Sequence, residues 1–347
     1  MKKINLLIAS LLILASCGKL HHRELFPAEP VQVEVNIIRF DSALLSVQTA
    51  DVRAGVDSLY ARYPEFMPVW VNSVLINYLG FLEDAGFITM APDSAVQYQL
   101  PVFLHDKHTG LEQANYDTRN VFADIKPLKQ SLNLAYGRWL TIEPEHRVPY
   151  IYFMLSAFFY PLISVGPDMA VGVEGYLGSD YPFYDQVVYN YQKLTMRPEC
   201  IPVNIILQDL KQTYPFDASQ ERLLDEMIYQ GKIMYMTSAL FAELPGYEII
   251  GYPKEKWEWC ETYEADLWKT LMDRQVLFSQ DPAVLASFLS DGPFTSEISQ
   301  DSPARLGTWL GWRIVEQYMN HNTDVTLLQL LNNNDAQQIL EHSKYRP

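Results

Sequence analysis

The hydrophobic pattern of the chain predicts a short strand, a series of helices, a buried β region and a second series of helices. Apolar and polar residues alternate strictly over residues 31–37, which is the period of a strand with one buried face. Steps of three or four then separate the apolar residues in segments 52–63, 71–78 and 121–139. The last of these stripes persists for about five turns and predicts one continuous helix.

The middle of the chain has a different pattern. Residues 148–159 form a near-continuous apolar run, and residues 169–178 form a short β-prone segment broken by glycines. Both are typical of buried strands, and the sequence Gly166-Pro167-Asp168 between them predicts a turn.

Helical patterns return in the second half. We expect helices over residues 201–212, 219–235, 254–274, 281–289 and 303–319. For the last helix, Ser302 is expected to be the N-cap, with Pro303 in the first turn. A small central sheet among many helices predicts an α+β fold that is predominantly helical, formed by a single domain over residues 31–347.

The N-terminus has the pattern of a cleaved secretory signal. Lys2 and Lys3 precede an apolar run over residues 4–14, which is too short to span a bilayer. The small residues before Cys17 give the cleavage point the form of a bacterial lipobox. We therefore expect residues 1–16 to be removed and Cys17 to carry the lipid that anchors the protein to a membrane. The alternative is an ordinary signal peptide with an incidental cysteine.

Charge and composition limit the possible partners. Loss of residues 1–16 removes two lysines and changes the net charge from −16 to −18. An acidic body of this kind is repelled by phosphate backbones, so no nucleic-acid partner is expected. Residues 17–30 are polar with two prolines and are interpreted as the lipidated N-terminus and tether of the globular body.

Cys200 and Cys260 allow two interpretations. An oxidising envelope compartment permits a disulfide bond between them. Cys260 also lies on an apolar helical stripe, which is equally typical of a buried free thiol.

The sequence contains none of the common catalytic motifs. There is no HExxH zinc motif, no GxSxG nucleophile elbow and no glycine-rich phosphate loop. His105 and His108 are three residues apart in a loop-like segment without an evident third ligand, so two solvated histidines are the simpler interpretation. No metal and no cofactor are expected.

Two features are anomalous for a packed helix. Glu264 falls within an apolar stripe, where it requires a partner or must be neutral. Arg305 and Arg313 are its candidate partners, and a pocket carboxylate is the alternative to a structural ion pair. Gln230 and Gly231 interrupt another apolar helix, where the glycine indicates either close backbone packing or part of a site.

Long segments of the second half resemble a known family. They are "YLGSDYPFY", "MIYQGKIMY", "IGYPKEKWEWCETYEADLW", "SPARLGTWLGWRIVEQYM" and the ending "SKYRP", and they occur in this order. Together with the lipobox, they resemble the gliding-motility lipoprotein GldB family of Bacteroidota. The resemblance implies a membrane-anchored envelope protein that serves the gliding machinery and the linked type IX secretion apparatus.

The GldB family is in turn similar to predicted zinc peptidases with an HExxH helix followed by a helix with a Glu-Gly pair. By this resemblance Gln230-Gly231 occupies the Glu-Gly position, and residues 200–210 occupy the HExxH helix without histidine or glutamate. The resemblance thus implies a degenerate zincin-like architecture whose zinc ligands are absent.

The sequence therefore favours a non-catalytic, lipid-anchored protein on the periplasmic side of the outer membrane, acting by contact with gliding or secretion proteins. The candidate residues of its degenerate site are Gln230, Gly231, Glu264 and Arg305. One alternative is an envelope peptidase or glycan hydrolase that uses carboxylates such as Glu264 and Asp180. Another is a carbohydrate-binding module with exposed Trp257, Trp309 or Trp312.

Overall fold

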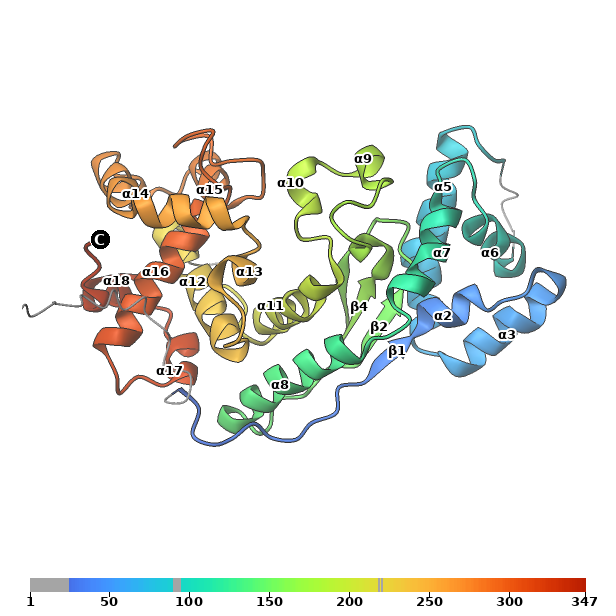
Figure 1. The fold of residues 1–347 in the computed structure, drawn as a ribbon, viewed down its shortest axis with the longest axis horizontal. Helices are drawn as coiled ribbons and strands as arrows, with labels where there is room; N and C mark the ends of the chain where they lie inside the picture. Colours follow the sequence, from blue (N-terminus) through green and yellow to red (C-terminus); the bar gives the residue numbers. More distant parts are fainter. Residues whose placement is uncertain (1–24, 90–94, 218, 220) are drawn as a thin grey trace, which may run out of the picture.

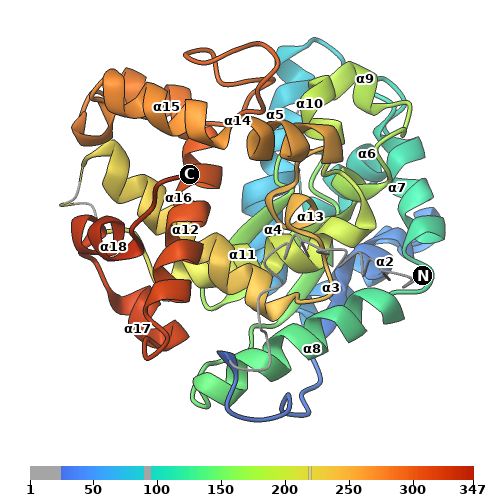
Figure 2. The ribbon, with the colours of Figure 1, turned by 60° about the vertical axis from the view of Figure 1, so that its left-hand side comes forward.

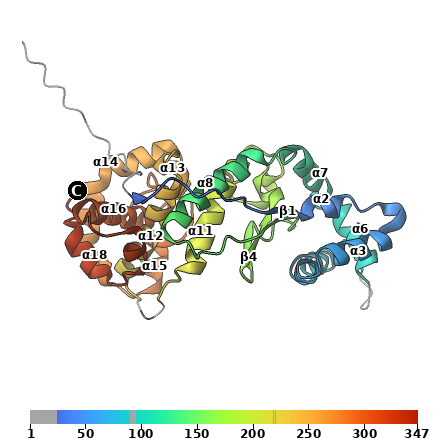
Figure 3. The same cartoon turned by 90° about the horizontal axis from the view of Figure 1, so that it is seen from below.

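The computed structural model describes residues 25–89, 95–217, 219 and 221–347. The molecule is elongated, with the N-terminal helices at one end, a small sheet near the middle and the C-terminal helices at the other end (Figure 1). The view from below shows the same order of parts along the long axis (Figure 3). The expected signal peptide and Cys17 lie outside the described residues.

The sheet consists of four short strands in the order β1-β2-β4-β3. They are β1 (Ile37–Arg39), β2 (Ile151–Met154), β3 (Leu162–Val165) and β4 (Asp168–Gly172). Strand β2 pairs in parallel with β1 and with β4, and β3 pairs antiparallel with β4. The β3–β4 turn passes through Gly166, whose φ of +59° suits glycine. The turn at residues 166–168 and buried strands within both predicted segments are confirmed. The turn, however, joins β4 to β3, a strand that the sequence did not predict. The predicted segments are also strand over only part of their length, since β2 ends at Met154 and a 3-10 helix follows β4.

Seven α-helices lie between β1 and β2 in the described residues. They are α2 (Phe40–Leu45), α3 (Val52–Arg62), α4 (Phe66–Trp70), α5 (Ile76–Asp84), α6 (Val96–Leu104), α7 (Leu111–Val121) and α8 (Lys126–Ile142), with a π-helical segment, η2 (Val71–Leu75), between α4 and α5. Indole Nε1 of Trp70 donates a hydrogen bond to the carbonyl of Leu155 at 2.8 Å. This bond ties the helices to the end of β2.

Two predictions in this half are wrong. The stripe over residues 121–139 is not one helix, because α7 ends at Val121 and α8 begins at Lys126. The Asp124 side chain accepts a hydrogen bond from the Lys126 amide at 2.9 Å, and proline follows in the first turn of α8. Together they start a new helix.

The strand expected over residues 31–37 is also largely absent, since only its last residue belongs to β1. The preceding segment lies along α8, where the Val31 amide donates to the Gly137 carbonyl at 3.0 Å. The Val35 amide donates to Oδ1 of Asn133 at 2.8 Å. A side chain at Gly137 would lie 2.5 Å from the Val31 carbonyl oxygen, so this glycine allows the close approach.

The second half is mainly helical. Its elements are η3 (Val173–Tyr176), α9 (Tyr184–Val187), α10 (Asn190–Lys193), η4 (Pro198–Cys200), α11 (Ile201–Thr213), α12 (Leu223–Leu240), α13 (Gly246–Ile250), α14 (Lys254–Asp273), η5 (Val276–Phe278), α15 (Pro282–Leu289), α16 (Leu306–His321), α17 (Leu327–Asn332) and α18 (Ala336–Ser343). The predictions for α11, α14 and α15 are confirmed to within a residue. Helix α12 begins later and ends later than predicted. The expectation of a predominantly helical α+β fold is confirmed.

The predicted start of α16 is wrong. The hydroxyl of Ser302 does not cap a helix but donates to the Ser299 carbonyl at 2.6 Å and accepts from the Thr295 amide at 3.1 Å. It thus closes the preceding loop, and α16 starts three residues later than predicted, with Arg305 as its N-cap.

Cys200 and Cys260 are both buried free thiols, which decides between the two interpretations left open by the sequence. Burial raises the pKa of both thiols. Within the described ranges, none of the helices has both the length and the apolar character needed to cross a membrane.

Candidate functional site

A cavity of about 680 Å³ lies between the loops that follow the sheet strands and the loops of the C-terminal helices. One wall comes from residues 156–161, from η3 and from the region of α9 and α10. The opposite wall comes from residues 251–256, which lead from the end of α13 into the first turn of α14, and from residues 291–305, between α15 and α16. Figure 1 shows these two groups of elements on either side of the middle of the molecule. Cavities of this size bind small ligands or segments of a partner.

The charged groups of the cavity are Arg305, Lys256 and Asp291. Nη2 of Arg305 donates to the Ile250 carbonyl at 2.7 Å, and its Nε lies 3.5 Å from Oδ1 of Asp291. This Nε is buried and has no hydrogen-bond partner among the described residues. Nζ of Lys256 donates to the Asp301 carbonyl at 2.6 Å. The cavity thus presents two cationic side chains against one carboxylate, which is itself 61% exposed.

The backbone of Arg305 is in the left-handed region, with φ at +56°. This conformation costs a residue with a side chain about 1 kcal/mol or more. The loop before it is held in place, because the Tyr252 hydroxyl donates to the Ala304 carbonyl at 2.6 Å. The Thr295 amide and hydroxyl both donate to the Pro303 carbonyl. These bonds hold Arg305 in its unfavourable conformation beside the cavity.

The opposite wall has two more left-handed residues in sequence, Ala157 and Phe158, with φ at +53° and +63°. Oε1 of the buried Glu174 accepts hydrogen bonds from the Ser156 amide at 2.6 Å, the Ser156 hydroxyl at 2.7 Å and the Phe158 amide at 3.0 Å. Its Oε2 has no partner among the described residues, and burial raises the pKa of Glu174 despite these bonds. Glu174 therefore fixes the loop that carries Phe158 and Phe159 into the cavity wall.

The mouth of the cavity is apolar and exposed. Tyr189 is 71% exposed, Val187 and Leu194 are each 42% exposed, and Phe159 is 39% exposed. The rings of Tyr189 and Tyr191 stack with their centroids 5.8 Å apart. Four large apolar side chains around one opening form the kind of surface patch that marks a binding site.

Among the sequence candidates, only Arg305 lines this cavity. Gly231 lies at the crossing of α12 and α16, the two helices seen side by side in Figure 2. A Cβ at Gly231 would be 2.3 Å from the carbonyl group of Gly311, and a Cβ at Gly311 would be 1.8 Å from the carbonyl oxygen of Met227. Close backbone packing therefore accounts for Gly231. Gln230, its neighbour, is half-buried.

Glu264 belongs to an ion-pair network. Its Oε1 accepts from Nε of Arg313 at 3.0 Å and from the hydroxyl of Tyr345 at 2.7 Å. Arg313 also pairs with Glu316, whose pKa is raised by burial. Arg313, rather than Arg305, is therefore the partner of Glu264, and the network ties α14 to α16 and to the C-terminus.

The structure does not join Glu264 and Asp180 in the cavity. Asp180 is exposed in the loop before α9, and neither side chain lines the cavity. Trp309 and Trp312 are 0% and 4% exposed, and half-buried Trp257 meets both rings edge-on. The tryptophans thus form internal packing and not a surface for sugars.

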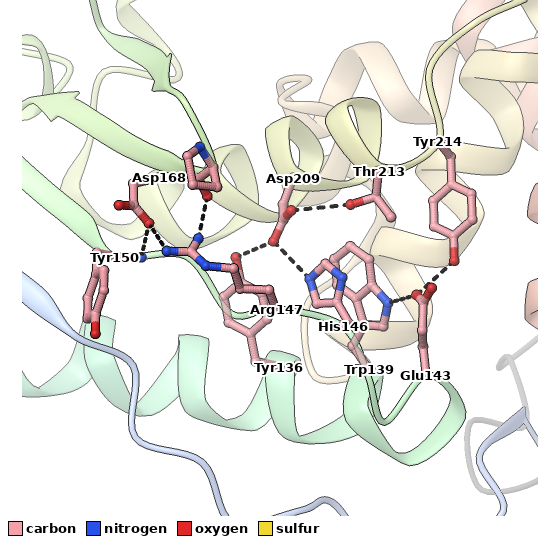
Figure 4. Close-up of polar contacts among 11 residues, drawn as sticks. Tyr136, Trp139, Glu143, His146, Arg147, Tyr150, Asp168, Asp209, Thr213 and Tyr214 are labelled. Atoms are coloured by element: carbon pink, nitrogen blue, oxygen red, sulfur yellow. Dashed lines mark hydrogen bonds and ion pairs between the residues drawn. The ribbon is translucent and has the colours of Figure 1, made fainter.

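A polar cluster that the sequence analysis missed lies on α11, the helix compared above with the HExxH helix (Figure 4). Oδ2 of the buried Asp209 accepts from the Tyr136 hydroxyl at 2.8 Å and lies 3.2 Å from Nε2 of His146. The His146 ring stacks on Trp139 with centroids 3.9 Å apart. Burial and the Asp209 charge raise the pKa of Tyr136. No periodicity indicates this cluster, because His146 lies in the loop after α8.

The polar groups of the described residues do not form a metal site. No three His, Cys, Asp or Glu side chains in these ranges lie together in a way that could hold an ion. His105 lies 3.2 Å from the Glu112 carboxylate, and the His108 ring stacks on Phe87.

Comparison with known proteins places the chain in a family. No curated protein and no solved structure was found to be significantly similar to it. A family model described as "Gliding motility protein GldB" matches residues 26–347, which include both walls of the cavity and the α12–α16 crossing. The chain belongs to the GldB family of gliding motility proteins.

Proposed function

We propose that this protein is a lipid-anchored component of the cell envelope that supports the gliding machinery, the linked type IX secretion machinery, or both. The observation that carries the proposal is the family match over nearly the whole described chain. Cys17, at the end of the lipobox, would provide the anchor. We place the body on the periplasmic side of the outer membrane, because residues 18–24 lack an acidic run that would indicate export to the outer face.

We further propose that the protein acts by contact with other proteins and not by catalysis. The described residues that line the cavity include no histidine and no cysteine, and Asp291 is their single carboxylate. Histidine, cysteine and paired carboxylates are the side chains that most often carry hydrolytic chemistry, so this lining favours a binding role.

The direct test is deletion of the gene in a host that glides and secretes through this pathway. We expect loss of spreading and gliding, reduced secretion, or both, with restoration by the unaltered gene. Normal gliding and normal secretion in the deletion strain would contradict the proposal.

The anchor has its own test. Cys17→Ala should release the body from the membrane fraction in a detergent-free fractionation, because a lipid chain is attached only through the cysteine. A matched Cys200→Ala variant should remain with the membranes. Retention of the Cys17→Ala protein in the membrane fraction would exclude lipid anchoring at this residue.

The periplasmic placement is tested by protease treatment of intact cells. We expect the protein to be protected from digestion.

A further inference from the structure

We propose that the cavity is a peptide-binding site in which a carboxylate pairs with Arg305 while neighbouring apolar side chains lie on the exposed aromatic mouth. The carboxylate comes from a chain terminus or from an acidic side chain of the partner. This inference rests on the proposed function, since it names the chemistry of the contact through which the protein would act.

The first argument is charge. The chain has 42 acidic and only 26 basic residues, yet the cavity reverses this balance with Arg305 and Lys256 against Asp291. Nε of Arg305 is buried beside Asp291, 3.5 Å from Oδ1, and Nη2 donates to the Ile250 carbonyl. The side chain is still 26% exposed, so a ligand carboxylate would pair with the accessible edge of the guanidinium, in a geometry that arginine favours.

The second argument is the composition of the mouth. Val187, Leu194 and Tyr189 are strongly exposed on this wall, and the described lining residues include no tryptophan. The aliphatic part of this mouth, Val187 and Leu194, suits the side chains of a peptide, because the hydroxyl groups of a sugar would lose hydrogen bonds to water against it. The apolar mouth and the cationic interior therefore favour a peptide with both an apolar residue and a carboxylate over an acidic glycan.

The third argument is that both walls are already fixed. Glu174 holds the Ala157–Phe158 loop, and Tyr252 holds the chain before Arg305. Residues in unfavourable backbone conformations persist where the surroundings enforce them, and they are concentrated at binding sites. A site fixed before binding has less conformational entropy to lose when the ligand enters.

The test uses the purified mature protein and three short probes. The first is N-acetyl-Phe-Tyr with a free terminal carboxylate, and the second is its C-terminal amide. The third is N-acetyl-Phe-Tyr-Asp-amide, in which the carboxylate belongs to a side chain. Binding is followed by ligand-observed NMR titration up to about 5 mM, a range suited to fragments of this size. We expect at least one acidic probe to bind about fivefold or more tightly than the neutral amide. The tighter of the two acidic probes identifies the source of the carboxylate.

Four variants locate the binding. Arg305→Gly should reduce the preference for acid over amide to about onefold, and its backbone remains suited to the left-handed conformation. Arg305→Lys should retain part of the preference through its charge. Tyr189→Ala should weaken acid and amide by the same factor. Arg274→Gln, which alters a half-exposed arginine paired with Glu297 outside the cavity lining, should change nothing.

A separate titration with an oligogalacturonate represents the acidic glycan. Three results would overturn the assignment: equal or undetectable binding of all three peptide probes to the unaltered protein, an acid preference that survives in Arg305→Gly, or tighter binding of the oligogalacturonate than of the peptides. The outcome is separate from that of the proposed function. Normal gliding and secretion in the deletion strain together with acid-specific binding would refute the envelope role and leave the site intact. A motility defect without probe binding would refute the site alone.

Discussion

The crossing of α12 and α16 and the cavity beside Arg305 both depend on unusual backbone, but for opposite reasons. At the crossing, Gly231 and Gly311 are in regular helix and are required by the space between two backbones. At the cavity, Ala157, Phe158 and Arg305 adopt conformations that favour glycine although none of them is glycine. At the crossing, glycine allows the two backbones to pack closely. At the cavity, residues with side chains occupy positions where glycine would have a lower conformational energy.

This difference separates structural from functional constraint. A glycine that only allows packing is accounted for by the close contact with the neighbouring helix. Gln275 and Lys344 also adopt the left-handed conformation, at helix ends outside the cavity lining. Phe158 and Arg305 both line the cavity, and the proposed binding site would account for them.

The largest expected effect is at the crossing. Gly311→Ala places a methyl group 1.8 Å from the Met227 carbonyl oxygen, which is backbone and can move only if the helices separate. We expect a loss of about 4 kcal/mol or more in the free energy of unfolding, measured by urea denaturation. The control is Gly80→Ala on α5, where a Cβ has no neighbour within 4 Å. That change should stabilise the protein by about 0.5–1 kcal/mol. Similar values for both variants would remove the packing explanation.

The second prediction concerns Lys232, a buried residue of α12. Its Nζ donates to the carbonyls of Leu331 at 3.1 Å and Asn333 at 2.7 Å, and burial lowers its pKa to about 8. The unfolded chain, with the ordinary value of 10.5, then binds more protons than the folded chain between these two pKa values. The free energy of unfolding should therefore rise by about 2 kcal/mol between about pH 7 and 9.5, relative to Lys232→Met. Parallel pH profiles of the two proteins would show that this lysine keeps its ordinary pKa.

The third prediction concerns the wall of the cavity. Burial raises the pKa of Glu174 above the ordinary value of 4.5, so its contribution to stability is complete below that value and decreases as pH rises through the folded pKa. Glu174→Gln retains an acceptor for the Ser156 and Phe158 amides and removes the titration. The stability of this variant relative to the unaltered protein should increase as pH rises above about 4.5. Thermal melts of both proteins across this range measure the effect, and a decrease instead would indicate a carboxylate favoured in its charged form.

The smallest expected effect concerns the left-handed backbone of Arg305. Arg305→Gly should be more stable than Arg305→Ala by about 1 kcal/mol, because only glycine adopts the left-handed conformation without steric cost. Both variants lose the same side-chain contacts, so each is the other's control. Equal stability in denaturant titrations would mean that the backbone at Arg305 relaxes when its side chain is removed.

Periodicity was a good guide wherever a segment packs by its own pattern. It located α11, α14 and α15 to within a residue, because their apolar faces require burial. It found the segments that contain β2 and β4 but not where these strands end, and it missed β3. It was wrong where long-range contacts replaced local ones. Residues 31–37 alternate like a strand, but Val31 and Val35 form hydrogen bonds with Gly137 and Asn133 on α8 instead of pairing in the sheet. Ser302 closes a loop with Thr295 instead of capping α16.

The candidate site was harder to predict from the sequence than the helices. Arg305 was the one candidate that lines the cavity, and it was selected as a partner for Glu264, which pairs with Arg313. The contacts of Glu174 with residues 156–158 and of Asp209 with His146 have no motif signal, since their members lie far apart in the sequence. The mouth residues over 187–194 are close in sequence but show no strand or helix periodicity.

The sequence by itself determined the family, the predominantly helical α+β class and the expectation of a lipid anchor, because ordered motifs and local hydrophobic patterns carry this information. Tertiary structure alone decided that Gly231 serves a helix crossing, that the two cysteines remain apart as thiols and that Arg305 faces a cavity. Each of these facts depends on which backbones meet in space, and a one-dimensional pattern does not encode contacts between segments that are far apart in the sequence.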